Sequence, residues 1–163
     1  MSRNRNRTWF FAGSLAFAFL LQLMPLPQSL LPLKPYWVGL VLIYWAIESP
    51  EHIGLGFAFL VGIAGDLLIG DLLAEQALRL VIMTFIVLRF RARLRFFPMW
   101  QQALAVLALL LNDRIVVIMI RGFAGDPMPS LSFWLSPLVG TVFWPFVFLV
   151  LDDLRSRLRV GDS

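Results

Sequence analysis

Three carboxylates that stand close together are the first residues of this chain that could do chemistry. Asp66, Asp71 and Glu75 lie within ten residues of one another, in an apolar stretch, 53–75, that reads IGLGFAFLVGIAGDLLIGDLLAE. An ionisable side chain at the depth of a lipid bilayer is costly unless it faces protein or water. Carboxylates placed in this way can receive a cation, a proton or the basic side chain of a partner. Asp66 is the first functional candidate.

A structural role is the alternative for the same three residues. Asp66 would then pair with Arg79 or Arg114 inside a helical bundle, because a buried charge needs a partner. Asp71 and Glu75 would be solvated, or would cap the start of the helix that follows them. The sequence leaves both interpretations open.

Two later apolar segments are also interrupted. Asp113 and Arg114 are neighbours late in segment 98–120. Arg114 is long enough to extend toward the nearer membrane surface, whereas Asp113 is too short and is expected to have an internal partner. Pro145 removes a backbone donor from the last segment, so the carbonyl one turn earlier needs another donor. The face that carries Trp144 is therefore expected to point into protein.

Small residues determine how the first of these carboxylates is positioned. Gly54, Ala58, Gly62 and Asp66 recur every four residues, so on an α-helix they form one lengthwise seam. Small side chains let a neighbouring backbone approach closely. The seam is therefore expected to meet another helix, with Asp66 at the contact. Gly54, Ala58, Gly62, Asp66, Asp71, Glu75 and Asp113 are the candidate partner-interface residues.

Catalytic and metal-binding signatures are absent from the sequence. The chain has no cysteine and a single histidine, His52, which excludes zinc-thiolate sites and histidine-based metal clusters. Phosphate-binding loops, nucleophile elbows and zinc-protease motifs are also missing. The prediction is a protein that is not an enzyme and has no cofactor.

The composition places the chain in a membrane. Hydrophobic residues make up 60% of it and charged residues 15%, against roughly 25% in soluble domains, and the mean hydropathy is +0.81. At about 20 residues per crossing, 163 residues are enough for five or six helices and little else. We expect an all-α integral membrane protein, a single transmembrane domain over 1–163 that bundles six helices. The predicted spans are about 8–25, 31–47, 53–69, 75–89, 98–120 and 131–151.

The second span is unusually short. After Pro35 only residues 36–47 can form a helix, which reaches about 18 Å across a hydrocarbon core of roughly 30 Å. Either 30–33 enters the membrane as non-helical chain, or this helix is sheltered by its neighbours.

Basic residues orient the bundle, because positive charge accumulates on the cytoplasmic side. With both termini in the cytoplasm, the outer loops carry only Lys34 and Arg121. The inner set is Arg3, Arg5, Arg7, Arg89, Arg91, Arg93, Arg95, Arg155, Arg157 and Arg159. Because these charges lie at membrane edges, the high pI does not indicate a nucleic-acid partner. Arg89, Arg91, Arg93 and Arg95 are expected to contact anionic lipid head groups, each worth about 1 kcal/mol.

Five segments together resemble the rod shape-determining membrane protein family MreD. They are LLQLMPLP (20–27), KPYWVGLVLIYW (34–45), GIAGDLLIGDLLAEQAL (62–78), MWQQAL (99–104) and FWPFVFLVLDDLR (143–155). The resemblance runs from the first span to the last. It rests on the ordered set of segments, the length and the topology, since no single motif is highly specific.

The resemblance implies a non-enzymatic scaffold in the bacterial cytoplasmic (inner) membrane. Such a subunit of the elongation machinery would bind MreC directly. Through MreC it would be linked to MreB filaments, the RodA glycosyltransferase and the elongation transpeptidase, and so to peptidoglycan synthesis and cell shape.

A second hypothesis comes from the same family. Its six-helix arrangement is similar to the substrate-binding subunit of energy-coupling-factor transporters, which implies a small-solute or lipid-binding membrane protein. That protein would have a pocket lined by Asp66, Asp113 and Trp144. A retained small molecule favours this hypothesis, and a retained MreC chain favours the scaffold.

Overall fold

The computed structural model describes residues 2–27, 29–30, 33–48, 53–69, 75–127, 129 and 131–161, with the backbone alone for 2–7 and 158–161. Every regular element in this part of the chain is helical, which confirms the predicted all-α class. The elements are α1 (Ser2–Leu23), α2 (Trp37–Glu48), α3 (Leu55–Ile69), α4 (Glu75–Phe96), α5 (Met99–Phe123), the short 3₁₀ helix η2 (Leu131–Trp134) and α6 (Leu135–Gly161).

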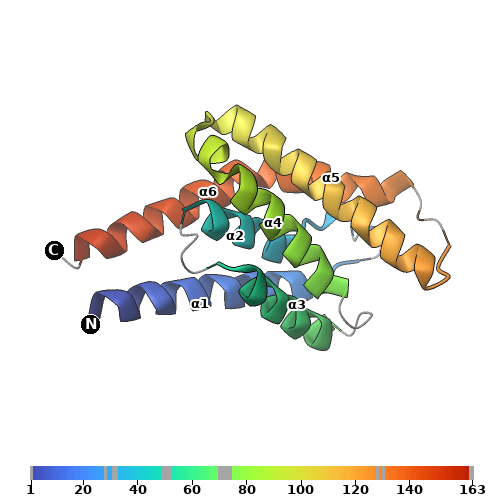
Figure 1. Ribbon diagram of the computed structural model, residues 1–163, viewed down its shortest axis with the longest axis horizontal. Helices are drawn as coiled ribbons and strands as arrows, with labels where there is room; N and C mark the ends of the chain where they lie inside the picture. The colour runs from blue at the N-terminus through green and yellow to red at the C-terminus, as the bar shows by residue number, and fades with distance from the viewer. Residues whose placement is uncertain are drawn as a thin grey trace.

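The helices run lengthwise through the molecule, so its two ends differ (Figure 1). One end carries the first turn of α1 and the last turn of α6, and we call it the terminal end. At the opposite end, the loop end, α5 finishes and α6 begins. Two ends of a chain on the same side agree with an even number of membrane crossings.

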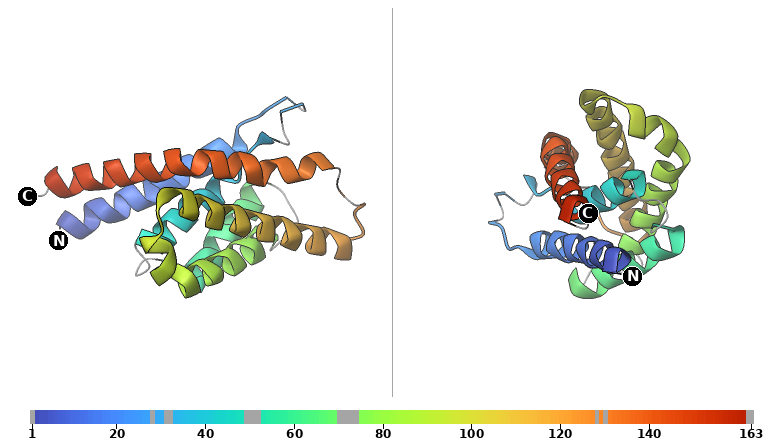
Figure 2. Two further views of the ribbon diagram at one scale, coloured as in Figure 1. Left: turned by 90° about the horizontal axis from the view of Figure 1, so that it is seen from above. Right: turned by 90° about the vertical axis from the view of Figure 1, so that its left-hand side faces the viewer.

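The short helix α2 lies at the centre of the bundle. It packs against α1, α4 and α6, and the end-on view in Figure 2 shows it surrounded by the other helices. All residues from Val38 to Ile47 are buried. A helix that is apolar on every side is expected in such a position. The structure thus has the second arrangement expected for this segment, a short helix sheltered by its neighbours.

Aromatic side chains hold α1 against this central helix. The ring of Trp45 makes edge contacts with Phe10 and Phe11, with centroids 5.5 and 5.1 Å apart. Its indole nitrogen donates a hydrogen bond to Ser14 Oγ at 2.8 Å. The single polar atom of the buried ring is thereby satisfied, as buried tryptophans require.

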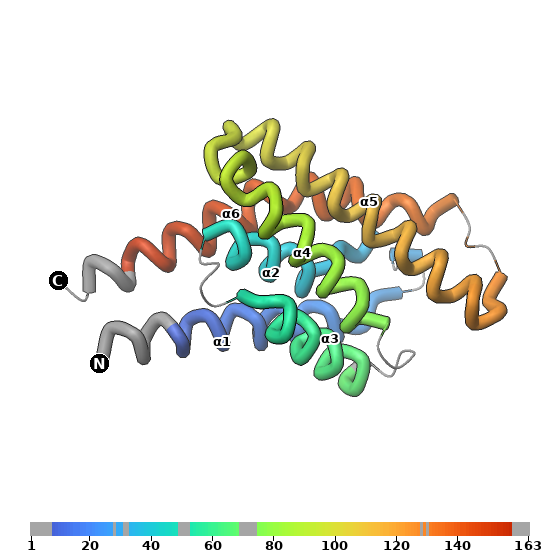
Figure 3. Tube along the Cα trace, viewed as in Figure 1, coloured from blue at the N-terminus to red at the C-terminus, as the bar shows by residue number. Residues whose placement is uncertain are grey.

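Helices α4 and α6 extend well beyond their predicted ends, and the trace in Figure 3 follows α4 to its last turn. α4 continues through the arginine-rich stretch to Phe96 and stops two residues before Pro98, and α6 continues to Gly161. Arginine is a good helix former, and Arg93 and Arg95 in the last turn of α4 suit the negative end of its dipole. The predicted spans end where the apolar segments end, whereas these helices continue into the polar residues that follow.

Two segments are long and apolar enough to cross a membrane: α5 and the segment Leu131–Arg157. Shorter apolar runs are Thr8–Leu23, Trp37–Glu48 and Leu55–Leu68. Large apolar side chains cover the outside of the bundle, including Phe17, Leu60, Leu67, Met119, Phe123, Val142 and Phe146. An apolar surface of this extent suits a lipid environment. Six crossings and cytoplasmic termini stay predictions.

Candidate functional site

Helix α4 of the same chain packs against the small residues of α3. Ala58 is fully buried. A Cβ on Gly62 would stand 2.2 Å from the Cα and 2.4 Å from the backbone nitrogen of Ala77. A Cβ on Gly65 would stand 2.7 Å from Gln76 Oε1. The two helices therefore touch backbone to backbone, and Gly62 serves packing within the chain.

Gly54 does not extend this seam. It precedes the first residue of α3, is exposed, and has no heavy atom within 4 Å of its Cβ position. Its carbonyl accepts the backbone hydrogen bond of Ala58 at 3.0 Å. The four-residue spacing predicted a contact at Gly54 because it assumed one helix throughout, whereas the helix begins at Leu55.

Asp66 is buried where α3 meets the start of α4. Its Oδ1 accepts a hydrogen bond from the backbone N–H of Gln76 at 2.9 Å, and its exposed fraction is 3%. Gln76 is in the first turn of α4, where N–H groups have no partner within the helix. A carboxylate at this position also suits the positive end of the helix dipole. Asp66 therefore caps α4 from the neighbouring helix.

The remaining carboxylate oxygen of Asp66, Oδ2, is buried and has no hydrogen-bond partner among the described residues. The predicted ion pair with Arg79 or Arg114 is not formed in the described part of the chain, because Arg79 contacts another carboxylate and Arg114 contacts an aromatic ring. The expected arginine pair of Asp66 is therefore wrong, and its contact within the described chain is the backbone N–H of Gln76.

Asp113 has the internal partner that its depth predicted. Arg79 Nε and Nη2 donate to Asp113 Oδ1 and Oδ2 at 2.9 and 2.7 Å. The guanidinium also lies over the ring of Tyr36, 4.2 Å from its centroid. The Tyr36 hydroxyl donates to Gln76 Oε1 at 3.2 Å. One polar cluster thus joins the start of α2 to α4 and α5.

The other polar residues at the loop end are also engaged. Glu75, the first residue of α4, is buried, and Arg121 Nε lies 3.4 Å from its Oε1. The interpretation of Glu75 as solvated is therefore wrong, because α5 covers it. The guanidinium of Arg114 lies 4.4 Å from the ring centroid of Phe133. Asp71 lies outside the described residues.

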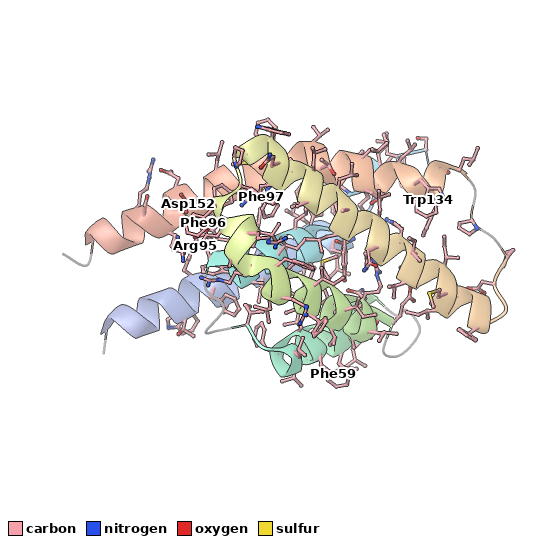
Figure 4. All side chains as sticks on the ribbon, turned by 45° about the horizontal axis from the view of Figure 1, so that its top comes forward. Phe59, Arg95, Phe96, Phe97, Trp134 and Asp152 are labelled. Atoms are coloured by element: carbon pink, nitrogen blue, oxygen red, sulfur yellow. The ribbon has the colours of Figure 1, made fainter. Side chains whose placement is uncertain are left out.

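The four arginines at the end of α4 differ in their surroundings. Arg89, Arg93 and Arg95 are exposed, whereas Arg91 Nε donates to the carbonyl of Ile47 at 2.8 Å, at the end of α2. The prediction of four equivalent surface contacts therefore needs correction for Arg91. Figure 4 shows Arg95 toward the terminal end and Trp134 toward the loop end.

A second arginine holds the same end of α2. Arg155 Nη2 lies 3.1 Å from Glu48 Oε2 and 3.4 Å from Asp152 Oδ1. The Tyr44 hydroxyl donates to the same Asp152 oxygen at 3.3 Å. Because the C-terminus of a helix carries partial negative charge, cationic side chains are stabilising there. The end of α2 is therefore tied to α4 and α6.

Sequence reasoning missed Gln102. Trp144, which was expected to point inward, is fully buried and donates from Nε1 to Gln102 Oε1 at 3.2 Å. Gln102 Nε2 donates to the carbonyl of Leu94 at 3.1 Å, so one amide links α4, α5 and α6. The adjacent amides Gln101 and Gln102 at the start of an apolar segment were the available signal, since polar side chains in such helices bond across to neighbours.

Among the described residues, Asp66, Asp113 and Trp144 do not line a common cavity of the three found there. Each is buried and engaged by a different partner within the chain. Cavities of about 190, 330 and 840 Å³ are lined by other residues.

Comparisons with known proteins agree with the resemblance. A family model described as rod shape-determining protein MreD matches residues 3–154. The rod shape-determining protein MreD of Haemophilus influenzae is 29% identical over 153 residues, which cover 93% of this chain and 94% of that protein. No solved structure matches the chain.

Proposed function

The chain belongs to the MreD family of rod shape-determining proteins, and on this premise we propose that it is a non-enzymatic scaffold of the bacterial cytoplasmic membrane. A role in cell shape follows from the family. The observation that carries the proposal is the match of the family model from residue 3 to residue 154. The described ionisable residues of the core support it, because they contact one another or the backbone.

The proposed topology is six crossings with both termini in the cytoplasm. The apolar outer surface of the bundle and the common position of the two chain ends support this arrangement (Figure 1). The last part of α4 lies toward the same end as the termini (Figure 1), and its exposed Arg89, Arg93 and Arg95 would contact anionic head groups of the inner leaflet.

The proposed binding surface for MreC is the open face of α3. This helix packs chiefly against α4, so much of its circumference is uncovered. Leu60 and Leu67, one heptad apart, are 66% and 72% exposed, and Leu68 lies beside them. Figure 4 shows Phe59 at the outer edge of the same helix. A transmembrane helix of a partner could pack along this face.

In this proposal the buried candidate residues do not contact MreC themselves but hold α3 and α4 in position. Gly62 and Asp66 fix α3 against α4, and Glu75 and Asp113 fix α4 against α5. MreC bound to α3 would connect this bundle to MreB, RodA and the elongation transpeptidase.

Co-purification with MreC tests the proposed surface. The Leu60→Ala/Leu67→Ala variant shortens two exposed side chains of α3 and should reduce the recovered MreC at least fivefold, with loss of rod shape. The matched control is Leu138→Ala/Leu149→Ala on α6, two leucines of similar exposure. Equal recovery of MreC with both variants would remove the α3 face from the interface.

A further inference from the structure

A polar cavity of about 190 Å³ lies at the loop end, where the approach to α2 meets α4 and α5. Its lining comes from elements far apart in the sequence. The described residues that line it are Gln22, Lys34, Pro35, Tyr36, Gln76, Arg79 and Arg114. Three of these side chains are cations and none of these seven is a carboxylate.

Two of the three cations form no ion pair within the described part of the chain. Both oxygens of Asp113 accept hydrogen bonds from Arg79. Lys34 Nζ donates to backbone carbonyls, those of Gln22 and Met24, and Arg114 lies on the Phe133 ring. In the part of the chain that the structure describes, neither Lys34 nor Arg114 meets a carboxylate. Partial burial of a cation without an ion-pair partner costs free energy. An anion bound in the cavity would offset this cost.

The neutral lining residues present hydrogen-bond donors to the cavity. Gln22 Oε1 accepts from the backbone N–H of Trp37 at 2.9 Å, and Gln76 Oε1 accepts from the Tyr36 hydroxyl at 3.2 Å. Because each amide oxygen already accepts one hydrogen bond, the side-chain NH₂ groups of both glutamines are left as donors. An anion that accepts hydrogen bonds would therefore suit this lining.

We propose that this cavity binds a phosphate group. A tetrahedral phosphate offers several charged acceptor oxygens, so it can contact Lys34, Arg79 and Arg114 from different sides at once. The phosphate could belong to an anionic lipid head group or be free in solution. The site uses the first turns of α4, whereas the exposed Arg89, Arg93 and Arg95 lie on the second half of that helix. It does not depend on the binding of MreC.

The sequence provides a direct probe of occupancy, because Lys34 is the only lysine of the chain. We would delipidate the full-length protein in a phosphate-free maltoside detergent and measure acylation of Lys34 by mass spectrometry. Additions would be dioctanoyl phosphatidylglycerol, inorganic phosphate, or dioctanoylglycerol as the lipid that lacks phosphate. The N-terminal amine is the internal control.

Phosphatidylglycerol should slow acylation of Lys34 at least fivefold if the phosphate is a head group, and inorganic phosphate should do so if it is free. Dioctanoylglycerol should have no effect. The proposal is overturned if neither phosphate compound slows the reaction, if the N-terminal amine slows equally, or if Lys34 is unreactive from the start.

A pair of variants locates the protection. Arg114→Gln should abolish it, whereas Arg95→Gln removes the same charge from the exposed far end and should keep it. Full protection in Arg114→Gln would contradict the assignment to this cavity. The wild-type measurement stands even if Arg114→Gln fails to fold, and a failure to bind MreC would not affect either result.

Discussion

Arg79 on α4 and Asp113 on α5 meet at two points, with nitrogen–oxygen distances of 2.9 and 2.7 Å. The side chains are only 10% and 2% exposed. This two-point geometry matches the planar guanidinium to the carboxylate and fixes the relative rotation of both helices. Because the pair also touches Tyr36 at the approach to α2, three segments of the bundle depend on one contact.

Removal of Asp113 alone should be strongly destabilising. The variant Asp113→Leu leaves the Arg79 guanidinium buried without its counter-charge, which costs about 3–5 kcal/mol in comparable buried pairs. The double variant Arg79→Met/Asp113→Leu should recover most of this loss, because no charge is left unpaired. Equilibrium unfolding in detergent, arranged as a double-mutant cycle, measures both.

The exposed pair Arg157–Asp153 on α6, at 3.1 Å, is the control. Asp153→Leu should change stability little, since exposed ion pairs contribute little in water. If Asp113→Leu and Asp153→Leu had equal effects, the pair on α4 and α5 would not carry the stability assigned to it.

The sequence predicts that Asp113 has an internal partner but not which one. Depth in an apolar segment follows from counting residues, and depth alone requires a counter-charge. The identity of the partner depends on which helix packs against α5 and at what rotation, which no spacing within one helix records. The same limit applies to Asp66, whose partner is a backbone N–H that every residue except proline has.

Gly62→Ala should be destabilising although alanine is the better helix former. The added Cβ would stand 2.2 Å from the Ala77 Cα, so α3 and α4 must move apart. Overpacking of this kind costs about 1–3 kcal/mol. The control on the same helix is Gly56→Ala, where the Cβ position is open and helix propensity favours alanine by about 1 kcal/mol. Unfolding in detergent should therefore shift in opposite directions, and equal shifts would contradict the close contact at Gly62.

Periodicity predicts the inner part of this seam correctly and its beginning incorrectly. Ala58, Gly62 and Asp66 share one buried face because the four-residue spacing holds throughout a regular helix. Gly54 does not share it, since the spacing cannot indicate that the helix starts at Leu55. Helix ends are set by turn geometry and by packing, which local spacing does not contain.

Arg91→Gln and Arg93→Gln should separate structural from surface arginines. Arg91 donates to the Ile47 carbonyl at the end of α2, and a hydrogen bond from a charged donor is worth about 1.5–3 kcal/mol. Arg93 is exposed, so its loss should leave the free energy of unfolding unchanged and weaken binding to anionic vesicles. Stability from detergent unfolding and affinity from vesicle flotation measure the two effects. If both variants lost the same stability, Arg91 and Arg93 would have equivalent roles and the distinction made here would be wrong.

Hydropathy predicts where α4 leaves the membrane, but not where the helix ends. The arginines after residue 88 mark a polar boundary, and the sequence analysis ends the span there. In the structure the helix continues to Phe96, because arginine favours helix and the first strong breaker is Pro98. This extension of α4 brings Arg91 beside the end of α2, and hydropathy alone does not predict such a contact.

The chain has no cysteine, so single introduced thiols report its topology without background. Ala124→Cys lies at the loop end and Ser156→Cys on the last part of α6. An impermeant maleimide should label position 124 in intact cells and position 156 only after permeabilisation, because the arginine distribution places the terminal end in the cytoplasm. Leu149→Cys, exposed on the middle of α6, should react slowly from either side, since a thiol in hydrocarbon does not ionise. One helix separates positions 124 and 156, so labelling of both from outside would mean that α6 does not cross the membrane, and labelling of position 156 alone would invert the proposed orientation.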